Sequence, residues 1–160
     1  MRSVVLFVAG VLVGLAVQTG VAQKRTEVYV NHVGLSVPSV DAALAFYTQK
    51  MGFREGFRQI SPEGKLVSAY VQVSKNTFIE LQEANAQRPA GVNHFGLAVD
   101  SIEDAVKLFR AGGATSSDPG APSAFSHARL ANVTDLNGVR VELAELTPDS
   151  LQRKAIDSWK

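Results

Sequence analysis

The sequence contains no cysteine. This absence excludes disulfide bonds, thiolate metal ligands and thiol nucleophiles, so packing alone must hold the folded chain together. Charge is scarce and balanced, since 16 Lys and Arg stand against 15 Asp and Glu for a formal net charge of +1. No basic stripe of the kind that binds nucleic acid interrupts the sequence. We therefore expect no nucleic-acid partner.

A long apolar run is also missing. The apolar stretch Val4–Val17 is shorter than the roughly 20 residues that a transmembrane helix needs. It follows Arg2 and precedes the small residue Ala22, a pattern typical of a secretory signal peptide. We predict a signal peptide over residues 1–22 and an exported protein, periplasmic or secreted. The alternative is an uncleaved N-terminal anchor, and no other membrane contact is expected.

The chain does contain an internal repeat. Val30–Val37, with the sequence VNHVGLSV, recurs as Val92–Val99, with the sequence VNHFGLAV. The offset is 62 residues, since 92 − 30 is 62, and the same offset relates Thr77–Leu81 to Val139–Leu143. A repeat of this length indicates a duplicated structural module.

The first repeat has the pattern of a strand, a helix and three strands. Alternation of apolar and polar residues predicts a strand over residues 27–37. Ser39 is placed to cap a helix that Gly52 ends. The apolar stripe of this helix, spaced i, i+3, i+4, i+7, consists of Val40, Ala43, Leu44 and Tyr47. Three further strands are predicted over residues 53–60, 66–73 and 77–82.

The second repeat follows the same order. Ser101 caps a helix that ends near Gly112, and two strands follow over residues 128–134 and 139–145. Residues 115–124 are too rich in Pro, Gly and Ser for a good strand, so a loop or a short edge strand is expected. The sequence thus predicts an α+β fold of two tandem βαβββ modules. They cover residues 27–84 and 92–146, and a C-terminal helix follows over residues 147–160.

Two histidines and two glutamates occupy equivalent places in the repeats: His32 with His94, and Glu80 with Glu142. Each glutamate stands between two apolar residues, and each histidine lies on the strand face opposite the apolar residue that follows it, so all four should point away from the helix-covered face. Imidazole and carboxylate groups bind zinc, nickel, iron, manganese and cobalt. If the modules pair about a pseudo-two-fold axis, the four side chains meet near that axis and can hold one divalent metal ion.

Plainer interpretations exist for each residue taken alone. A glutamate in a strand is usually solvated, and a histidine at a strand start is often only hydrogen-bonded; the shared offset is what favours a metal site. His127 has no counterpart in the repeat and fits a loop. Arg140 shares a face with Glu142 and could meet an anionic substrate, although a solvated arginine is the simpler interpretation. Further side chains that could line the cup are Tyr70, Gln72, Phe78 and Arg129.

These motifs resemble those of the vicinal oxygen chelate superfamily. The residues that carry the resemblance are the repeated VNHxGL segments, Phe46-Tyr47 ahead of Met51–Phe53, and Asp135–Leu143. The superfamily includes glyoxalase I, extradiol dioxygenases, methylmalonyl-CoA epimerase, fosfomycin-resistance transferases and the metal-free bleomycin-resistance proteins. The resemblance covers residues 27–146 and implies that the two modules form a curved mixed sheet, shaped as a cup.

Within that superfamily, a His-Glu-His-Glu set is similar to the ligand set of glyoxalase I. The resemblance implies that His32, Glu80, His94 and Glu142 bind the metal ion, and that one of the two glutamates, Glu142 or Glu80, is the catalytic base. A metal that holds two vicinal oxygens stabilises an enediolate, while a carboxylate moves the proton. We therefore expect a metal-dependent, glyoxalase I-like lyase or isomerase that acts on a small oxygen-rich substrate.

Two alternatives remain open. The first is an extradiol-type, ring-cleaving dioxygenase, which would need redox-active iron in the same site. The second is a metal-free protein of the bleomycin-resistance type that binds a small ligand in the cup. The expected export also argues against a glutathione adduct as substrate, because glutathione is largely cytosolic. The sequence does not decide whether one chain completes the cup or whether a homodimer is needed.

Overall fold

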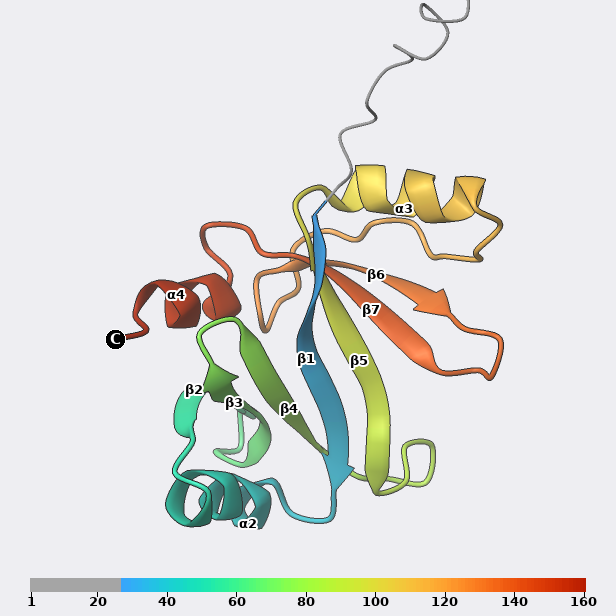
Figure 1. The fold of residues 1–160 in the computed structure, drawn as a ribbon. Helices are drawn as coiled ribbons and strands as arrows, with labels where there is room; N and C mark the ends of the chain where they lie inside the picture. Colours follow the sequence, from blue (N-terminus) through green and yellow to red (C-terminus); the bar gives the residue numbers. More distant parts are fainter. Residues whose placement is uncertain (1–26) are drawn as a thin grey trace, which may run out of the picture.

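The structure is a computed structural model that describes residues 27–160 (Figure 1). The predicted signal peptide, residues 1–22, lies outside the described residues and stays a prediction. Within the described part of the chain, no helix has the length and apolar character needed to cross a membrane.

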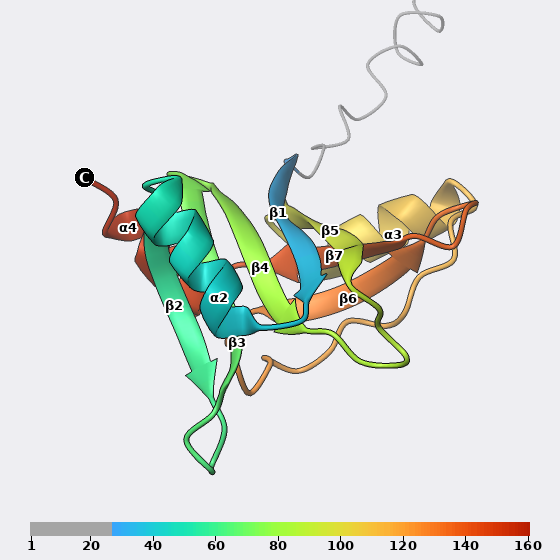
Figure 2. The same cartoon turned by 90° about the horizontal axis from the view of Figure 1, so that it is seen from below.

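Seven strands form one mixed sheet in the order β2-β3-β4-β1-β5-β7-β6 (Figures 1 and 2). β1 and β5 lie at its centre and run antiparallel, and each pairs in parallel with the last strand of its own module. The two halves are therefore related by a pseudo-two-fold axis between β1 and β5. The strands are β1 Val28–Val37, β2 Arg54–Ile60, β3 Leu66–Ser74, β4 Thr77–Glu83, β5 Gly91–Val99, β6 Arg129–Thr134 and β7 Arg140–Glu145.

The first module has the predicted βαβββ order. Helix α2, Val40–Ala45, begins at Ser39, whose hydroxyl accepts the backbone N–H of Ala42, and continues as a π-helical turn over Phe46–Lys50. Gly52 then adopts a φ of 73°, as expected for a residue that ends a helix in the left-handed region. The predicted apolar stripe packs on the outer face of the sheet against Leu35, Val37, Ala69, Val71, Ile79 and Leu81.

The second module repeats this packing. Helix α3, Ile102–Ala111, is capped by Ser101, and its apolar stripe lies on the other half of the same sheet face. The core beneath it contains Ile102, Ala105, Val106, Phe109, Leu97, Val99, Ala131 and Leu143. Because each helix covers one half of the outer face, the opposite face of the central strands is left to the polar residues of the repeat.

The second module lacks one regular strand. Between α3 and β6 the chain makes only isolated bridges, Ser116 with Val133 and Pro122 with Arg129, within the described residues. This confirms the loop or poor edge strand expected over residues 115–124. Figure 1 shows the segment running along the outer edge of β6.

The C-terminal helix is shorter than predicted. Helix α4 spans Leu151–Asp157, whereas a helix over residues 147–160 was predicted from the sequence. Ser150 is the N-cap, since its hydroxyl accepts the backbone N–H of Arg153. The side chain of Ser150 therefore sets the start of the helix, and Thr147 and Pro148 belong to the turn before it.

Aromatic side chains and α4 fill the first module's half of the cup. Phe57 stacks on Tyr70 with ring centroids 4.5 Å apart, and Phe125 reaches over both rings from the loop before β6. Ala155 and Ile156 of α4 complete this third core together with the fully buried Phe78. Tyr70 and Phe78 were expected to line the cup. Both are packed in this core, and the Tyr70 ring also lies edge-on against His32, with ring centroids 5.7 Å apart.

We predict a large difference between two Leu→Ala variants. Leu143 is fully buried beneath α3, so Leu143→Ala should lower the free energy of unfolding by about 2–5 kcal/mol. Leu136 is fully exposed at the β6–β7 turn, and Leu136→Ala should stay within about 0.5 kcal/mol of the parent protein. Urea titrations of the two variants measure both values. Equal destabilisation would contradict this assignment of the core.

Candidate metal centre

The pairing of β1 with β5 brings the two histidines together. His32 lies opposite Gly96 and His94 lies opposite Gly34 in the antiparallel register. Each imidazole occupies the space over the other strand's glycine: a Cβ on Gly34 would lie 2.1 Å from His94 Cε1, and one on Gly96 would lie 2.0 Å from His32 Cε1. The repeated His-x-Gly spacing therefore has a physical cause, since any side chain at these glycines would overlap an imidazole ring.

The parallel pairings add the two glutamates. Glu80 on β4 lies opposite Gly34, and Glu142 on β7 lies opposite Gly96. Four neighbouring strands, β4, β1, β5 and β7, thus direct one polar side chain each toward the same point. All four side chains are buried, with His32 and His94 fully inaccessible to solvent. The cluster is completed within a single chain.

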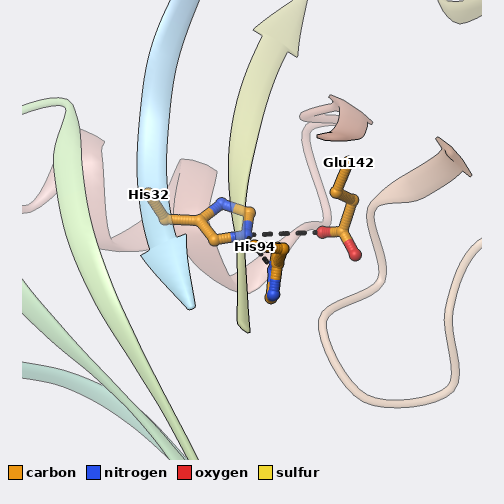
Figure 3. Close-up of side chains that lie close together, drawn as sticks. All are labelled: His32, His94 and Glu142. Carbon is orange, nitrogen blue, oxygen red and sulfur yellow. Dashed lines mark hydrogen bonds and ion pairs between the residues drawn. The ribbon is translucent and has the colours of Figure 1, made fainter. Parts of the chain in front are cut away.

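The distances within the cluster are short. His32 Nε2 lies 3.0 Å from His94 Nε2 and 3.5 Å from Glu142 Oε1 (Figure 3). Glu80 Oε2 lies 3.1 Å from His94 Nε2 and 3.8 Å from His32 Nε2. One potential ligand atom from each of His32, His94 and Glu142 lies within 4.8 Å of the other two. Glu80 reaches both imidazoles from β4, whereas Glu142 reaches them from β7, on the other side of the central strands β1 and β5.

Two asparagines orient the imidazoles. Asn31 and Asn93 are the extra residues of β-bulges, placed where the β1–β5 register shifts beside each histidine. The Oδ1 of Asn31 is 3.0 Å from His32 Nδ1, and the Oδ1 of Asn93 is 2.9 Å from His94 Nδ1. A hydrogen bond at Nδ1 fixes the ring so that Nε2 faces the other ring. The strand pattern alone did not predict this role, although both asparagines recur unchanged in the repeat.

Each glutamate also has a partner that holds one of its oxygens. Gln82 Nε2 donates to Glu80 Oε1 over 2.7 Å, which leaves Oε2 toward the histidines. Arg140 Nη1 donates to Glu142 Oε2 over 3.1 Å, which leaves Oε1 toward His32. Each carboxylate therefore presents one free oxygen to the centre.

Burial sets the protonation states of the cluster. Burial lowers the pKa of His32 to about 4, although the negative charge of Glu80 acts to raise it. This imidazole is therefore neutral at pH 7. Burial and the charge of Glu80 raise the pKa of Glu142 above its usual value. Burial acts in the same direction on Glu80, but interactions with His94, His32 and Gln82 outweigh it and hold the pKa of Glu80 below its usual value. The two carboxyl groups thus have different acidities.

The arrangement fits a divalent metal ion. Metal–nitrogen bonds of about 2.0–2.1 Å at tetrahedral or octahedral angles put two donor atoms about 2.9–3.4 Å apart, and the two Nε2 atoms are 3.0 Å apart. A neutral imidazole is the form that binds metal. The donor set of two nitrogens with carboxylate oxygens suits zinc, nickel, iron, manganese or cobalt. The four predicted ligands are His32, Glu80, His94 and Glu142. Their distances are compatible with a bound metal ion, and their assignment as ligands stays a prediction.

Other candidate residues lie elsewhere or serve the fold. His127 is exposed in the loop before β6, with a φ of 58°, and does not join the cluster. Arg129 was expected to line the cup, but its guanidinium pairs with Glu103 and Glu145, so that prediction is wrong. Gln72 is fully buried and donates to the carbonyl oxygens of Lys75 and Ala155, which fixes α4 to the sheet.

Comparison with known proteins identifies the family. Residues 29–143 match the family described as the Glyoxalase/Bleomycin resistance protein/Dioxygenase superfamily. The chain belongs to this superfamily. The match spans both modules and all four residues of the cluster, which confirms the resemblance stated from the sequence.

One sequence relative and two solved structures are similar to this chain. The chain is 29% identical over 129 residues to a probable lactoylglutathione lyase, chloroplastic, from Arabidopsis thaliana; the match covers 73% of this chain and 35% of that protein. The chain therefore spans about a third of the length of this relative. The fold resembles methylmalonyl-CoA epimerase from Mycobacterium tuberculosis (TM-score 0.63, 22% identity, 74% of this chain and 88% of that one). A hypothetical protein from Bacillus halodurans C-125 is similar too (TM-score 0.63, 23% identity, 76% and 96%).

We predict that Gly96→Ala disturbs the cluster. The new Cβ would overlap the His32 ring, so the ring must leave its position and the free energy of unfolding should fall by about 1–3 kcal/mol. Urea titration measures the stability, and NMR of the histidine ring signals measures the displacement. Gly112→Ala is the matched control, because its Cβ would meet nothing closer than 3.4 Å. An unchanged His32 signal in Gly96→Ala would contradict the account of the His-x-Gly spacing.

Proposed function

We propose that the protein is a metal-dependent lyase or isomerase of the glyoxalase I type, acting on a small substrate with two neighbouring oxygens. The observation that carries the proposal is the pair of Nε2 atoms 3.0 Å apart, with a carboxylate on either side. The relationship to a probable lactoylglutathione lyase supports the reaction class. A metal in this position would polarise a substrate carbonyl and stabilise the charge that develops on its oxygen.

Side chains of the cluster would hold the metal and transfer the proton. His32 and His94, held at Nδ1 by their asparagines, would bind the metal through Nε2. Glu80 and Glu142 flank the same point from opposite sides, which is the placement needed to remove a proton from one carbon and return it to its neighbour. All four side chains are buried, which would limit the access of water to a reaction at this point. We also propose, from the N-terminal sequence, that the protein is exported.

A second candidate is an extradiol-type dioxygenase. The set of His32, His94 and Glu142 contains two histidines and one carboxylate, which is the ligand set of many non-haem iron(II) oxygenases. The identity of the metal separates the two candidates. Zinc or nickel favours proton transfer, whereas iron(II) with oxygen uptake on a catechol favours the dioxygenase.

We predict about one divalent metal ion per chain. Elemental analysis of the protein, purified and after reconstitution with each metal in turn, should find it in the parent protein. The double variant His32→Ala/His94→Ala should lose it, because both nitrogen ligands are gone. His127→Ala is the matched control, since this histidine lies outside the cluster. If the folded parent protein takes up no metal, the proposed enzyme is wrong and a metal-free ligand-binding protein takes its place.

A further inference from the structure

A cavity lies at the end of the sheet where β1 begins and where β5 and β7 end. Its volume is about 270 Å³, and its walls come from these strand ends, the linker from β7 to α4, and α4 itself. Figure 1 shows the linker passing the ends of the central strands on its way to α4. None of the residues that line the cavity belongs to the histidine and glutamate cluster. The cavity is therefore separate from the candidate metal centre.

The bulge at Asn31 directs Tyr29 into this cavity. Beyond the bulge, Tyr29 pairs with Ala98. Ala98 follows Leu97, which packs beneath α3 on the outer face, so Ala98 and Tyr29 point to the opposite, concave face. Without the extra residue, alternation from His32 would place Tyr29 on the outer face. The bulge thus brings a phenol into the wall of the cavity.

Two charged side chains that line the cavity have no ion-pair partner within residues 27–160. One is Arg153 of α4, which is partly exposed, and the other is Asp100, which is exposed directly after β5. The lining carboxylate of Glu145 differs, because its Oε2 accepts the backbone N–H of Ile102 at 3.1 Å and lies 3.3 Å from Arg129 Nη1. Among the described residues, the lining therefore contributes one unpaired cation and one unpaired anion.

The Tyr29 side chain lies near both of these charges. Burial raises the pKa of Tyr29, the charge of Arg153 acts to lower it, and the charges of Glu27 and Asp100 add to the rise. The phenol therefore keeps its proton at pH 7 and can donate a hydrogen bond as well as accept one. A cation, a carboxylate and a neutral hydroxyl thus border the same cavity.

The rest of the wall is largely apolar. Ala98 and Val99 are buried, and Leu146 and Pro148 continue the apolar surface along the linker. The volume of about 270 Å³ equals that of about nine molecules of liquid water at about 30 Å³ each, which is room for about eight or nine non-hydrogen atoms. The cavity therefore suits a small ligand that carries both charges and an apolar group.

We propose that this cavity binds a small apolar α-amino acid as a zwitterion. The ligand carboxylate pairs with Arg153, because a guanidinium offers two parallel N–H donors to a carboxylate. The ligand ammonium pairs with Asp100, and the Tyr29 hydroxyl donates to the ligand carboxylate. The apolar side chain lies against Ala98 and Val99. The inference does not depend on the proposed function, since no residue of the metal cluster takes part.

The test compares L-leucine with two analogues that each lack one charge. Isocaproate keeps the carboxylate and lacks the amine, whereas isoamylamine keeps the amine and lacks the carboxylate. NMR titrations of the purified protein give each Kd from the backbone amide signals of Val99, Asp100 and Thr147, which line the cavity. L-valine and L-proline are titrated in the same way, as zwitterions with other small apolar side chains.

Three variants complete the test. Arg153→Gln and Asp100→Asn each remove one of the two charges at the cavity. Lys154→Gln is the matched control, because it removes a cation from the next position of α4 that lies outside the cavity and is 3.9 Å from Asp149. The amide spectrum of each variant also shows whether it is folded.

We expect L-leucine to bind with a Kd of about 1 mM or tighter, and each analogue to bind about tenfold or more weakly. Arg153→Gln and Asp100→Asn should each weaken the binding of L-leucine about tenfold, and Lys154→Gln should leave it unchanged. Equal binding of L-leucine and either analogue would overturn the inference, as would undiminished binding to folded Arg153→Gln. It would also be overturned if none of the three amino acids shifted the cavity signals at concentrations up to about tenfold above this Kd.

Discussion

The antiparallel register between β1 and β5 is the constraint on which the rest of the structure depends. It sets each histidine of the repeat over the glycine of the other strand, which is the only residue type that leaves room for the ring. The parallel partners of these strands then supply one glutamate each at the same level. A shift of β5 by one residue along β1 would turn His94 to the outer face while His32 stays on the inner face. The fold and the site therefore share one set of backbone hydrogen bonds.

Gathering four ionisable side chains in the interior is costly unless each has a partner. The chain meets this requirement with neighbours that hold the outer atoms and leave the inner ones free. Asn31 and Asn93 bind the Nδ1 atoms, and Gln82 and Arg140 each hold one carboxylate oxygen. The inner Nε2 and carboxylate oxygen atoms then face one another at 3.0–3.8 Å. An arrangement that leaves two nitrogens and two oxygens directed at one point is suited to a cation.

The periodicity of the sequence predicted much of the fold and of the candidate site. The 62-residue repeat predicted two modules, and the alternation around His32 and Glu80 predicted that these side chains share the face away from the helices. The repeat could not reveal how the halves differ, because differences come from tertiary contacts. Arg140, whose counterpart in the first repeat is Phe78, contacts His94, whereas Phe78 is packed with Tyr70. The bulges at Asn31 and Asn93 also depend on cross-strand pairing, which a single strand pattern does not contain.

The most direct test of the central claim is anomalous diffraction from crystals of the cobalt(II)-loaded protein, recorded at the cobalt absorption edge. We predict one strong peak per chain between His32 Nε2 and His94 Nε2, within bonding distance of a glutamate oxygen. Absence of a peak there, or a peak bound by other residues, would contradict the assignment of this cluster as a metal centre.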